Sequence, residues 1–197
     1  EPELARIVSG RLAELMALNL PASGRDRERM VTVAGLVIGL RVRNTRRGRM
    51  AFLTLDDRTG RLEVRVFTDT FEQYRHKIAR DRILVIRGNL ALDDYSGVNQ
   101  LTADEILDMA EARARMARGL VIRIDERRAA NGFARELARV LEPFREGGEC
   151  PIWLDYRNRA ARARVRLGDD WTVFPADELI GRLRELAGEG AIEVDYS

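Results

Sequence analysis

The order of strand-like and helix-like patterns between residues 31 and 106 limits the folds open to this chain more than any other feature. Three runs of strand character come first, then a helical pattern, then two more such runs. In the third run Leu62, Val64 and Val66 alternate with charged residues, which predicts one buried face and one wet face. The expected elements are strands at 31–42, 49–55, 61–67, 83–92 and 98–106, and a helix at 69–81. This order predicts a small β-barrel.

Three strands, a helix and two strands is the order of the OB-fold, a five-stranded Greek-key barrel that binds oligonucleotides or oligosaccharides. Its ligand lies on the face of strands 2 and 3, between the loops that follow strands 1 and 4. We therefore predict an OB-fold over residues 30–110. Residues 1–29 are expected to precede it as a helix (1–20) and a polar linker (21–29).

A second domain is expected over residues 111–197, after a connecting helix at 105–117. Its patterns run strand, helix, strand, strand, helix, strand. The second of these helices has Pro175 in its first turn and Gly188 at its end, which are good start and stop signals. The order βαββαβ predicts a two-layer α/β sandwich. The whole chain is thus expected to combine a β-barrel with a small α/β domain.

The placement of arginine tells more than its amount. Thirty-three of the 34 basic residues are arginine, which a GC-rich genome would also produce. Residues 31–67 contain eight arginines and three acidic residues, a balance of +5. Residues 68–110 contain five basic and eight acidic residues, a balance of −3, and residues 111–197 contain sixteen of each. The positive charge therefore belongs to one part of the predicted barrel.

The stretch RVRNTRRGRM (41–50) places five arginines at the loop after the first strand, beside the expected ligand site. Gly48 would let the loop turn tightly, and a base could stack on Phe52, at about 1–3 kcal/mol per base. The alternative is that Phe52 is core and the arginines only discourage edge pairing. The candidate nucleic-acid-binding residues are Arg41, Arg43, Arg46, Arg47, Arg49, Phe52, Arg61 and Arg65.

A second basic stripe lies in the expected α/β domain. Arg162, Arg164 and Arg166 fall on one face of a strand, and Ala163 and Val165 fall on the other. This pattern is typical of the wet side of a half-buried sheet. It could also meet an acidic partner, although acidic residues balance the charge of this domain.

Catalytic chemistry finds little support. His76 is the only histidine and Cys150 the only cysteine, so no triad, histidine-rich metal site or internal disulfide is expected. The acidic pairs Asp56/Asp57, Asp93/Asp94 and Asp169/Asp170 fall in turn sequences, where Asp bonds nearby backbone amides. We expect no catalytic residue, metal or cofactor. No apolar run approaches the roughly 18–20 residues of a membrane span, and a reducing cytoplasm is expected.

Several longer stretches resemble a known family. They are VTVAGLVIGLRVRNTRRGRMAFLTLDDRTGRLEVRVFTD, DRILVIRGNLALDDYSG and EARARMARGL, followed by LEPFREG, RARVRLG and PADELIGRLREL. Over about residues 30–197 the chain is similar to the C-terminal region of the bacterial DNA polymerase III alpha subunit. Because it also starts without Met, we expect a piece of that longer chain, without the polymerising palm or the N-terminal PHP domain.

The resemblance implies a division of roles. In that family the parent chain is a DNA-directed DNA polymerase, the OB domain binds single-stranded template, and the last domain binds the tau subunit of the clamp loader. Other replicase subunits would be met through the parent chain. Carried onto this sequence, the DNA-facing positions are Arg43, Arg46, Arg47 and Arg49. The tau-facing positions are expected in the final helix and strand, at Leu179, Leu183, Val194 and Tyr196.

Two other functions remain open. An OB module of the tRNA-anticodon type would prefer RNA and read unstacked bases with aromatic side chains, which are few here. A pure protein-interaction module would have no measurable affinity for oligonucleotides at physiological salt. Phosphate binding by arginines instead predicts a steep salt dependence, with a log–log slope of about −0.7 per contact on single strands.

Overall fold

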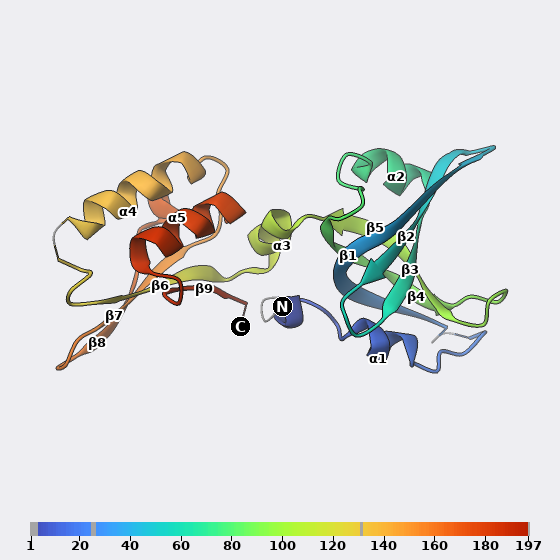
Figure 1. The fold of residues 1–197 in the computed structure, drawn as a ribbon, viewed down its shortest axis with the longest axis horizontal. Coiled ribbons are helices and arrows are strands. Elements are labelled where there is room, and N and C mark those ends of the chain that lie inside the picture. The colour runs from blue at the N-terminus through green and yellow to red at the C-terminus, as the bar shows by residue number, and fades with distance from the viewer. Residues whose placement is uncertain (1–3, 25–26, 131, 197) are drawn as a thin grey trace. The chain divides into compact units, whose positions relative to one another are not determined.

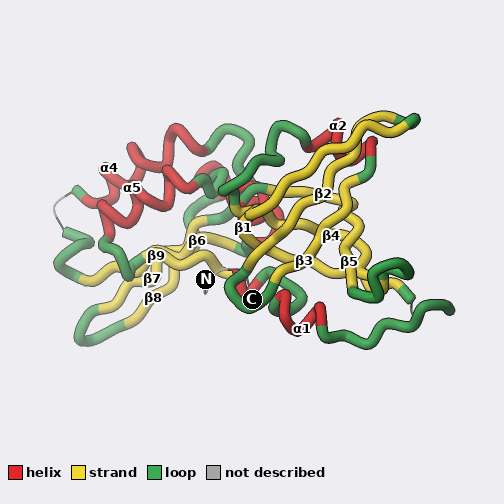
Figure 2. The backbone as a smooth tube through the Cα atoms, turned by 45° about the vertical axis from the view of Figure 1, so that its right-hand side comes forward, coloured by secondary structure: helices red, strands yellow, loops and turns green. Residues whose placement is uncertain are grey.

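The computed structural model describes residues 4–24, 27–130 and 132–196, and the chain divides after Asp108 into two compact units (Figure 1). The first unit is mostly strand, as Figure 2 shows. Its short helices are η1 (Leu4–Arg6, a 3-10 helix), α1 (Leu12–Met16) and α2 (Thr68–Tyr74). Its strands are β1 (Glu28–Thr45), β2 (Gly48–Asp56), β3 (Arg61–Val66), β4 (Ile83–Leu92) and β5 (Asn99–Leu107).

The five strands form a closed barrel in the order β1-β2-β3-β5-β4. One long strand makes closure possible, because the first half of β1 pairs with β4 and its second half pairs with β2. The register of β1 against β2 shifts between Val37 and Gly39, so the strand bends where it passes from one partner to the other. A short parallel pairing of β3 with β5 completes the ring. The predicted OB-fold is confirmed.

Alternation along the strands fills the barrel. Leu53 and Leu55 of β2 and Leu62 and Val64 of β3 are fully buried, and the residues between them lie on the outer face. Short helices add to the same core, with Leu12 and Leu15 from α1 and Phe71 from α2. Burial of this apolar area drives the barrel to close, at about 25 cal/mol for each Å² removed from water.

The helix predicted over residues 1–20 is wrong. Residues 1–3 lie outside the described ones, and the rest forms only η1 and the five-residue α1. Ser9 explains the break, because its backbone amide donates to the carbonyl of Thr32 and its hydroxyl accepts from the Thr32 amide. Its backbone is thereby tied to β1. The apolar spacing that suggested one helix instead places Leu12 and Leu15 in the barrel core.

The turn DDRTG between β2 and β3 fixes α1. Asp57 Oδ2 accepts from the Leu12 amide at 2.9 Å and Thr59 Oγ1 accepts from the Ala13 amide at 3.3 Å. Asp57 Oδ1 accepts from Thr59 and Gly60 within the turn. Two amides at the start of α1 are therefore satisfied by a turn 45 residues away, which no local capping pattern could reveal.

Several expected boundaries move. The helix predicted over 69–81 begins at Thr68, with Phe67 as its N-cap, and ends at Tyr74. The helix predicted over 105–117 begins at Met109, because β5 continues to Leu107. The first strand is longer than predicted at both ends, and this extra length carries its arginines beyond the barrel core.

The second unit is a four-stranded sheet in the order β8-β7-β6-β9, and the order βαββαβ is confirmed. Helices α4 and α5 lie on one face (Figure 1). Its elements are α3 (Met109–Met116), β6 (Gly119–Asp125), α4 (Phe133–Leu141), η2 (Glu142–Phe144), β7 (Ile152–Arg157), β8 (Arg162–Arg166), η3 (Asp169–Trp171), α5 (Asp177–Ala187) and β9 (Ile192–Asp195). Strand β8 ends at Arg166, and further along the chain Val173 makes an isolated bridge to Cys150.

Candidate nucleic-acid interface

The arginines of residues 41–50 lie on a β-hairpin formed by the end of β1 and the start of β2, here called the arginine hairpin. Its strands pair as far as Thr45 and Gly48, so Arg46 and Arg47 form the turn itself. The Thr45 hydroxyl donates to the Gly48 carbonyl and accepts from the Arg47 amide, which fixes the turn. Gly48 has φ +116, and a Cβ there would lie 2.6 Å from Thr68 Cγ2. Both observations require glycine.

A row of side chains crosses the outer face of β1, β2 and β3. Arg41 is registered with Phe52, and Phe52 with Arg65, so the three share one face. Phe52 is half-buried there while its neighbour Leu53 is fully buried inside. The alternative in which Phe52 belongs to the core is therefore wrong. The guanidinium carbons of Arg41 and Arg43 lie 5.7 and 5.6 Å from its ring centroid, within cation–π range.

Four of the candidate arginines are neutralised by carboxylates. The pairs are Arg41–Glu63 at 2.7 Å, Arg49–Glu72 at 3.0 Å, Arg61–Asp56 at 3.1 Å and Arg65–Asp93 at 3.2 Å. By contrast, Arg43, Arg46 and Arg47 are exposed and make no ion pair with any residue that the structure describes. The sequence placed all eight candidates together, and the structure separates three unpaired cations from the rest.

The turn between β4 and β5 forms the second rim of this face. Asp93 accepts from the Ser96 hydroxyl and amide and from Arg65. These hydrogen bonds, those from Ser96 first, lower the pKa of Asp93. Tyr95 at the tip of this turn is 100% exposed. Tyr95 is not among the residues predicted from the sequence, although an aromatic inside DDYSG, the loop that an OB-fold uses as a rim, was a signal for it.

The acidic pairs act mainly as turn residues. The Asp56 carboxylate accepts from the Arg58 amide and from Arg61, and these two interactions lower the pKa of Asp56. Burial raises the pKa of Asp57, but the hydrogen bonds from Leu12, Thr59 and Gly60 outweigh it and the net pKa falls. Within the described residues no group of three or more His, Cys, Asp and Glu could hold a metal.

The two residues offered as a nucleophile or base are poorly placed for either role. Cys150 is 2% exposed, and burial raises the pKa of its thiol to about 11, so it stays protonated at neutral pH. His76 is exposed in a turn after α2.

The predicted partner-binding residues need correction. Leu179 and Leu183 are fully buried in the core of the second unit, so they cannot contact a partner of the folded protein. The amphipathic face of α5 is used for packing within its own unit. Val194 is partly buried against the same core. Tyr196, just after β9, is half-buried, and its role in partner binding stays a prediction.

Comparisons with known proteins agree with this geometry. Residues 136–188 match the family model described as DNA polymerase III subunit alpha, C-terminal domain. Residues 31–125 match the family model of an OB-fold nucleic acid binding domain. A DNA polymerase III subunit alpha from Escherichia coli O157:H7 is 43% identical over 172 residues, which is 87% of this chain. The chain belongs to the DNA polymerase III alpha family.

The similarity to alpha subunits extends along the chain. The alpha subunit of Vibrio cholerae is 37% identical over 196 residues, 99% of this chain. The chain spans 15% and 16% of the length of these two relatives. Among solved structures, a small single-stranded DNA-binding protein from Streptomyces coelicolor covers 42% of this chain and 96% of its own, with 18% identity and a TM-score of 0.36. That likeness carries no argument about function.

Among the described residues, no helix has both the length and the apolar character needed to cross a membrane.

Proposed function

We propose that the barrel of this alpha-subunit segment binds single-stranded DNA through the arginine hairpin. The observation that carries the proposal is the set of three exposed, unpaired arginines, Arg43, Arg46 and Arg47, beside the outer face of β2 and β3. A guanidinium without a carboxylate partner keeps its donors and its charge for a phosphate. Each neutralised phosphate releases counterions, which favours binding at low salt.

The hairpin supports backbone binding more than base reading. Phe52 is the aromatic on β2, and two guanidinium groups already lie within 6 Å of its ring. Tyr95 on the opposite rim is fully exposed and offers a free ring on which a base can stack. One stacking platform and several cations give affinity with little sequence preference.

We also propose a wider role for the parent chain of this segment. The parent chain would be a replicative DNA-directed DNA polymerase of the cytoplasm, whose chemistry lies elsewhere in that chain. This segment would need no cofactor or metal of its own. Its second unit would dock the tau subunit of the clamp loader, and the family membership supports this assignment.

The test is fluorescence anisotropy of a labelled dT oligonucleotide across a salt series. The chain is compared with Arg46→Ala/Arg47→Ala, and the slope of log affinity against log salt should flatten by about 1.4, or 0.7 for each lost contact. Arg80→Ala/Arg82→Ala is the matched control, because both arginines are exposed on the same unit but away from the hairpin. Its slope should stay unchanged.

An RNA oligonucleotide of equal length separates the remaining functions. Equal or weaker binding of RNA supports the DNA-binding role. A clear preference for RNA would favour the anticodon-type module. The absence of binding at low salt would leave only a protein-interaction module.

A further inference from the structure

One face of the second unit carries a set of arginines that the proposed DNA site does not use. The register of β6, β7 and β8 puts them on one side of the sheet. The other side, with Ile122, Ile124 and Leu154, packs in the core with α4 and α5. We call this set the arginine face: Arg123, Arg157, Arg162, Arg164 and Arg166.

Three members of the arginine face are already paired. Arg123 contacts Glu193, Arg166 lies 2.8 Å from Asp169, and Arg164 lies 3.2 Å from Asp195. Arg164 also lies over the ring of Trp153, 5.1 Å from its centroid. These contacts fix the side chains of three arginines. The end of the face formed by Arg157 and Arg162 differs, because it lacks such ion pairs among the described residues.

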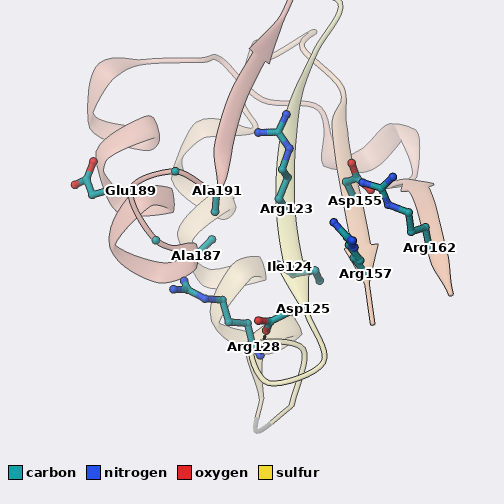
Figure 3. A pocket seen from close by; sticks show the side chains of 12 residues that line it. Arg123, Ile124, Asp125, Arg128, Asp155, Arg157, Arg162, Ala187, Glu189 and Ala191 are labelled. Carbon is teal, nitrogen blue, oxygen red and sulfur yellow. Dashed lines mark hydrogen bonds between the residues drawn. The ribbon is translucent and has the colours of Figure 1, made fainter. Parts of the chain in front are cut away.

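At that end, Arg157 of β7 and Arg162 of β8 are direct cross-strand partners. Both are exposed, and neither makes an ion pair with a residue that the structure describes. Like charges directly opposite in a sheet are destabilising. Both line a pocket of about 460 Å³ (Figure 3), whose other charged residues are Arg123, Arg128, Asp125, Asp155 and Glu189, so four arginines face three carboxylates. An anionic group placed here would relieve the repulsion between the two guanidinium groups.

Strand β8 also offers unused backbone. It stands at one end of the strand order, and all five of its residues are exposed. The Leu167 amide donates to the Ile152 carbonyl, toward β7. Antiparallel pairing alternates, so the backbone groups of Arg162, Arg164 and Arg166 point away from the sheet. The same residues therefore present charged side chains on the arginine face and hydrogen-bonding groups at the sheet edge.

We propose that an extended, acidic segment of a partner protein adds to β8 as a further strand and sets carboxylates against Arg157 and Arg162. The proposal rests on the docking role given to the second unit above. A peptide strand satisfies the outward backbone groups, and its alternate side chains meet the arginine face. Nucleic acid fits less well, because a phosphodiester backbone has no alternating N–H and C=O groups that could pair with the free edge of β8. The competing reading is that β8 is arginine-rich only to prevent edge-to-edge aggregation.

The first test titrates the whole chain with a labelled peptide of about ten residues, a common strand length, in which Glu and Thr alternate. The same peptide with Gln for Glu is the ligand control. Binding should weaken about tenfold or more in Arg157→Gln/Arg162→Gln, the loss of one charged hydrogen bond or more. Arg135→Gln/Arg139→Gln on the exposed side of α4 removes the same charge from the same unit and should bind as the unaltered chain does.

The second test isolates the backbone contribution. Arg164→Gln and Arg164→Pro lose the same charge, the same contact with Asp195 and the same contact with Trp153. Only the proline also loses the outward amide, while the amides that face β7 stay. The Glu–Thr peptide should therefore bind more weakly to the proline variant. Equal binding by both variants, with circular dichroism showing both folded, would overturn strand addition.

Other outcomes are equally decisive. No binding of the Glu–Thr peptide, equal binding of its Gln form, or equal binding by Arg157→Gln/Arg162→Gln overturns the proposal. So does competition by a dT oligonucleotide that depends on Arg157 and Arg162, because the face would then belong to nucleic acid. Titration with the tau subunit separates this from the docking role. If tau binds the chain and the Arg157→Gln/Arg162→Gln variant equally, the docking role is supported and the addition of an acidic strand is contradicted. If tau does not bind at all, docking fails and the peptide titration still decides the face.

Discussion

Both units have arginine at alternate positions of a strand, yet the two regions differ in what the arginines meet. In the arginine hairpin, Arg43, Arg46 and Arg47 extend beyond the barrel core and have no carboxylate among the described residues. On the arginine face, Arg123, Arg164 and Arg166 are paired with acidic residues of β9 or η3.

The difference shows that composition alone does not make a phosphate-binding site. An arginine that already holds a carboxylate must lose that contact before it can bind a phosphate, and exposed ion pairs are worth about 0–1 kcal/mol. Interspersed acids also repel a nucleic-acid chain over a distance of about 10 Å at moderate salt. Unpaired arginines with no acids among them suit nucleic acid, whereas arginines mixed with acids suit a protein surface.

The comparison breaks if removal of the three unpaired arginines leaves DNA binding intact. We expect Arg43→Ala/Arg46→Ala/Arg47→Ala to lower dT-oligonucleotide affinity at least tenfold at low salt, since each lost charged hydrogen bond is worth about 1.5–3 kcal/mol. The salt slope should fall by about 2, or 0.7 for each contact. Anisotropy across a salt series measures both quantities. An unchanged slope would show that phosphates bind elsewhere.

Tyr95 sharpens the comparison, because stacking does not depend on charge. Tyr95→Ala should weaken dT binding by about 1–3 kcal/mol if one base stacks on the ring. The salt slope should stay as it is, since no cation is lost. Tyr95→Phe keeps the ring and serves as the control. Equal affinity of the alanine and phenylalanine variants would remove the β4–β5 turn from the site.

The position of the site follows from the sequence, but the division of its arginines into ion-paired and unpaired ones does not. Alternation in β3 and the order of elements predicted the barrel, and the barrel placed the arginines of 41–50 at its rim. The ion pairs of Arg41 with Glu63 and Arg49 with Glu72 join residues 22 and 23 positions apart, and they depend on strand register and on where α2 packs. No local pattern contains that information.

The errors have similar physical origins. Leu179 and Leu183 form an apolar helix face, and such a face looks the same whether it packs on its own sheet or on a partner. The break in the N-terminal helix depends on hydrogen bonds between Ser9 and Thr32, which exist only once β1 is in place. Tyr95 sits in a turn, where periodicity gives no indication of exposure.

The comparison also requires that the barrel carrying both rims is stably folded. A substitution of Asp57, which holds the start of α1, tests this stability. Asp57→Ala should cost about 1 kcal/mol of stability at pH 7, as the loss of a helix-capping carboxylate does. Because the folded pKa of Asp57 is lowered, its contribution is present above the ordinary value of 3.8 and is lost as the pH falls through the folded pKa. Hydrogen exchange of the Leu12 amide should be faster in the variant at pH 7, and urea unfolding curves of the two proteins should converge in acid. A difference that persists unchanged at low pH would mean that the charge of Asp57 plays no part.

Freeing paired arginines of the barrel should increase the difference in DNA affinity between the barrel and the arginine face. Glu63→Gln/Glu72→Gln removes the carboxylates that hold Arg41 and Arg49. Each freed guanidinium can take a phosphate, so dT affinity should rise a few-fold at low salt, and the slope should steepen by up to about 1.4. Salt-series anisotropy is again the measurement, with Glu136→Gln/Glu146→Gln in the second unit as the control of equal charge change. A rise of equal size in both variants would show a general effect of net charge rather than the release of two particular arginines.

The smallest expected effect on dT affinity concerns the arginine face of the second unit. Arg123→Gln/Arg164→Gln/Arg166→Gln removes the three ion-paired arginines of the face, as many positive charges as the hairpin triple variant. We nevertheless expect dT affinity at physiological salt to stay within about twofold, because each of these guanidinium groups is already held by a carboxylate. The slope should also be unchanged, since slope counts phosphates neutralised and not total charge. If this variant lost as much affinity as the hairpin variant, ion pairing with Glu193, Asp195 and Asp169 would not protect an arginine from phosphate, and the distinction between the two regions would have to be abandoned.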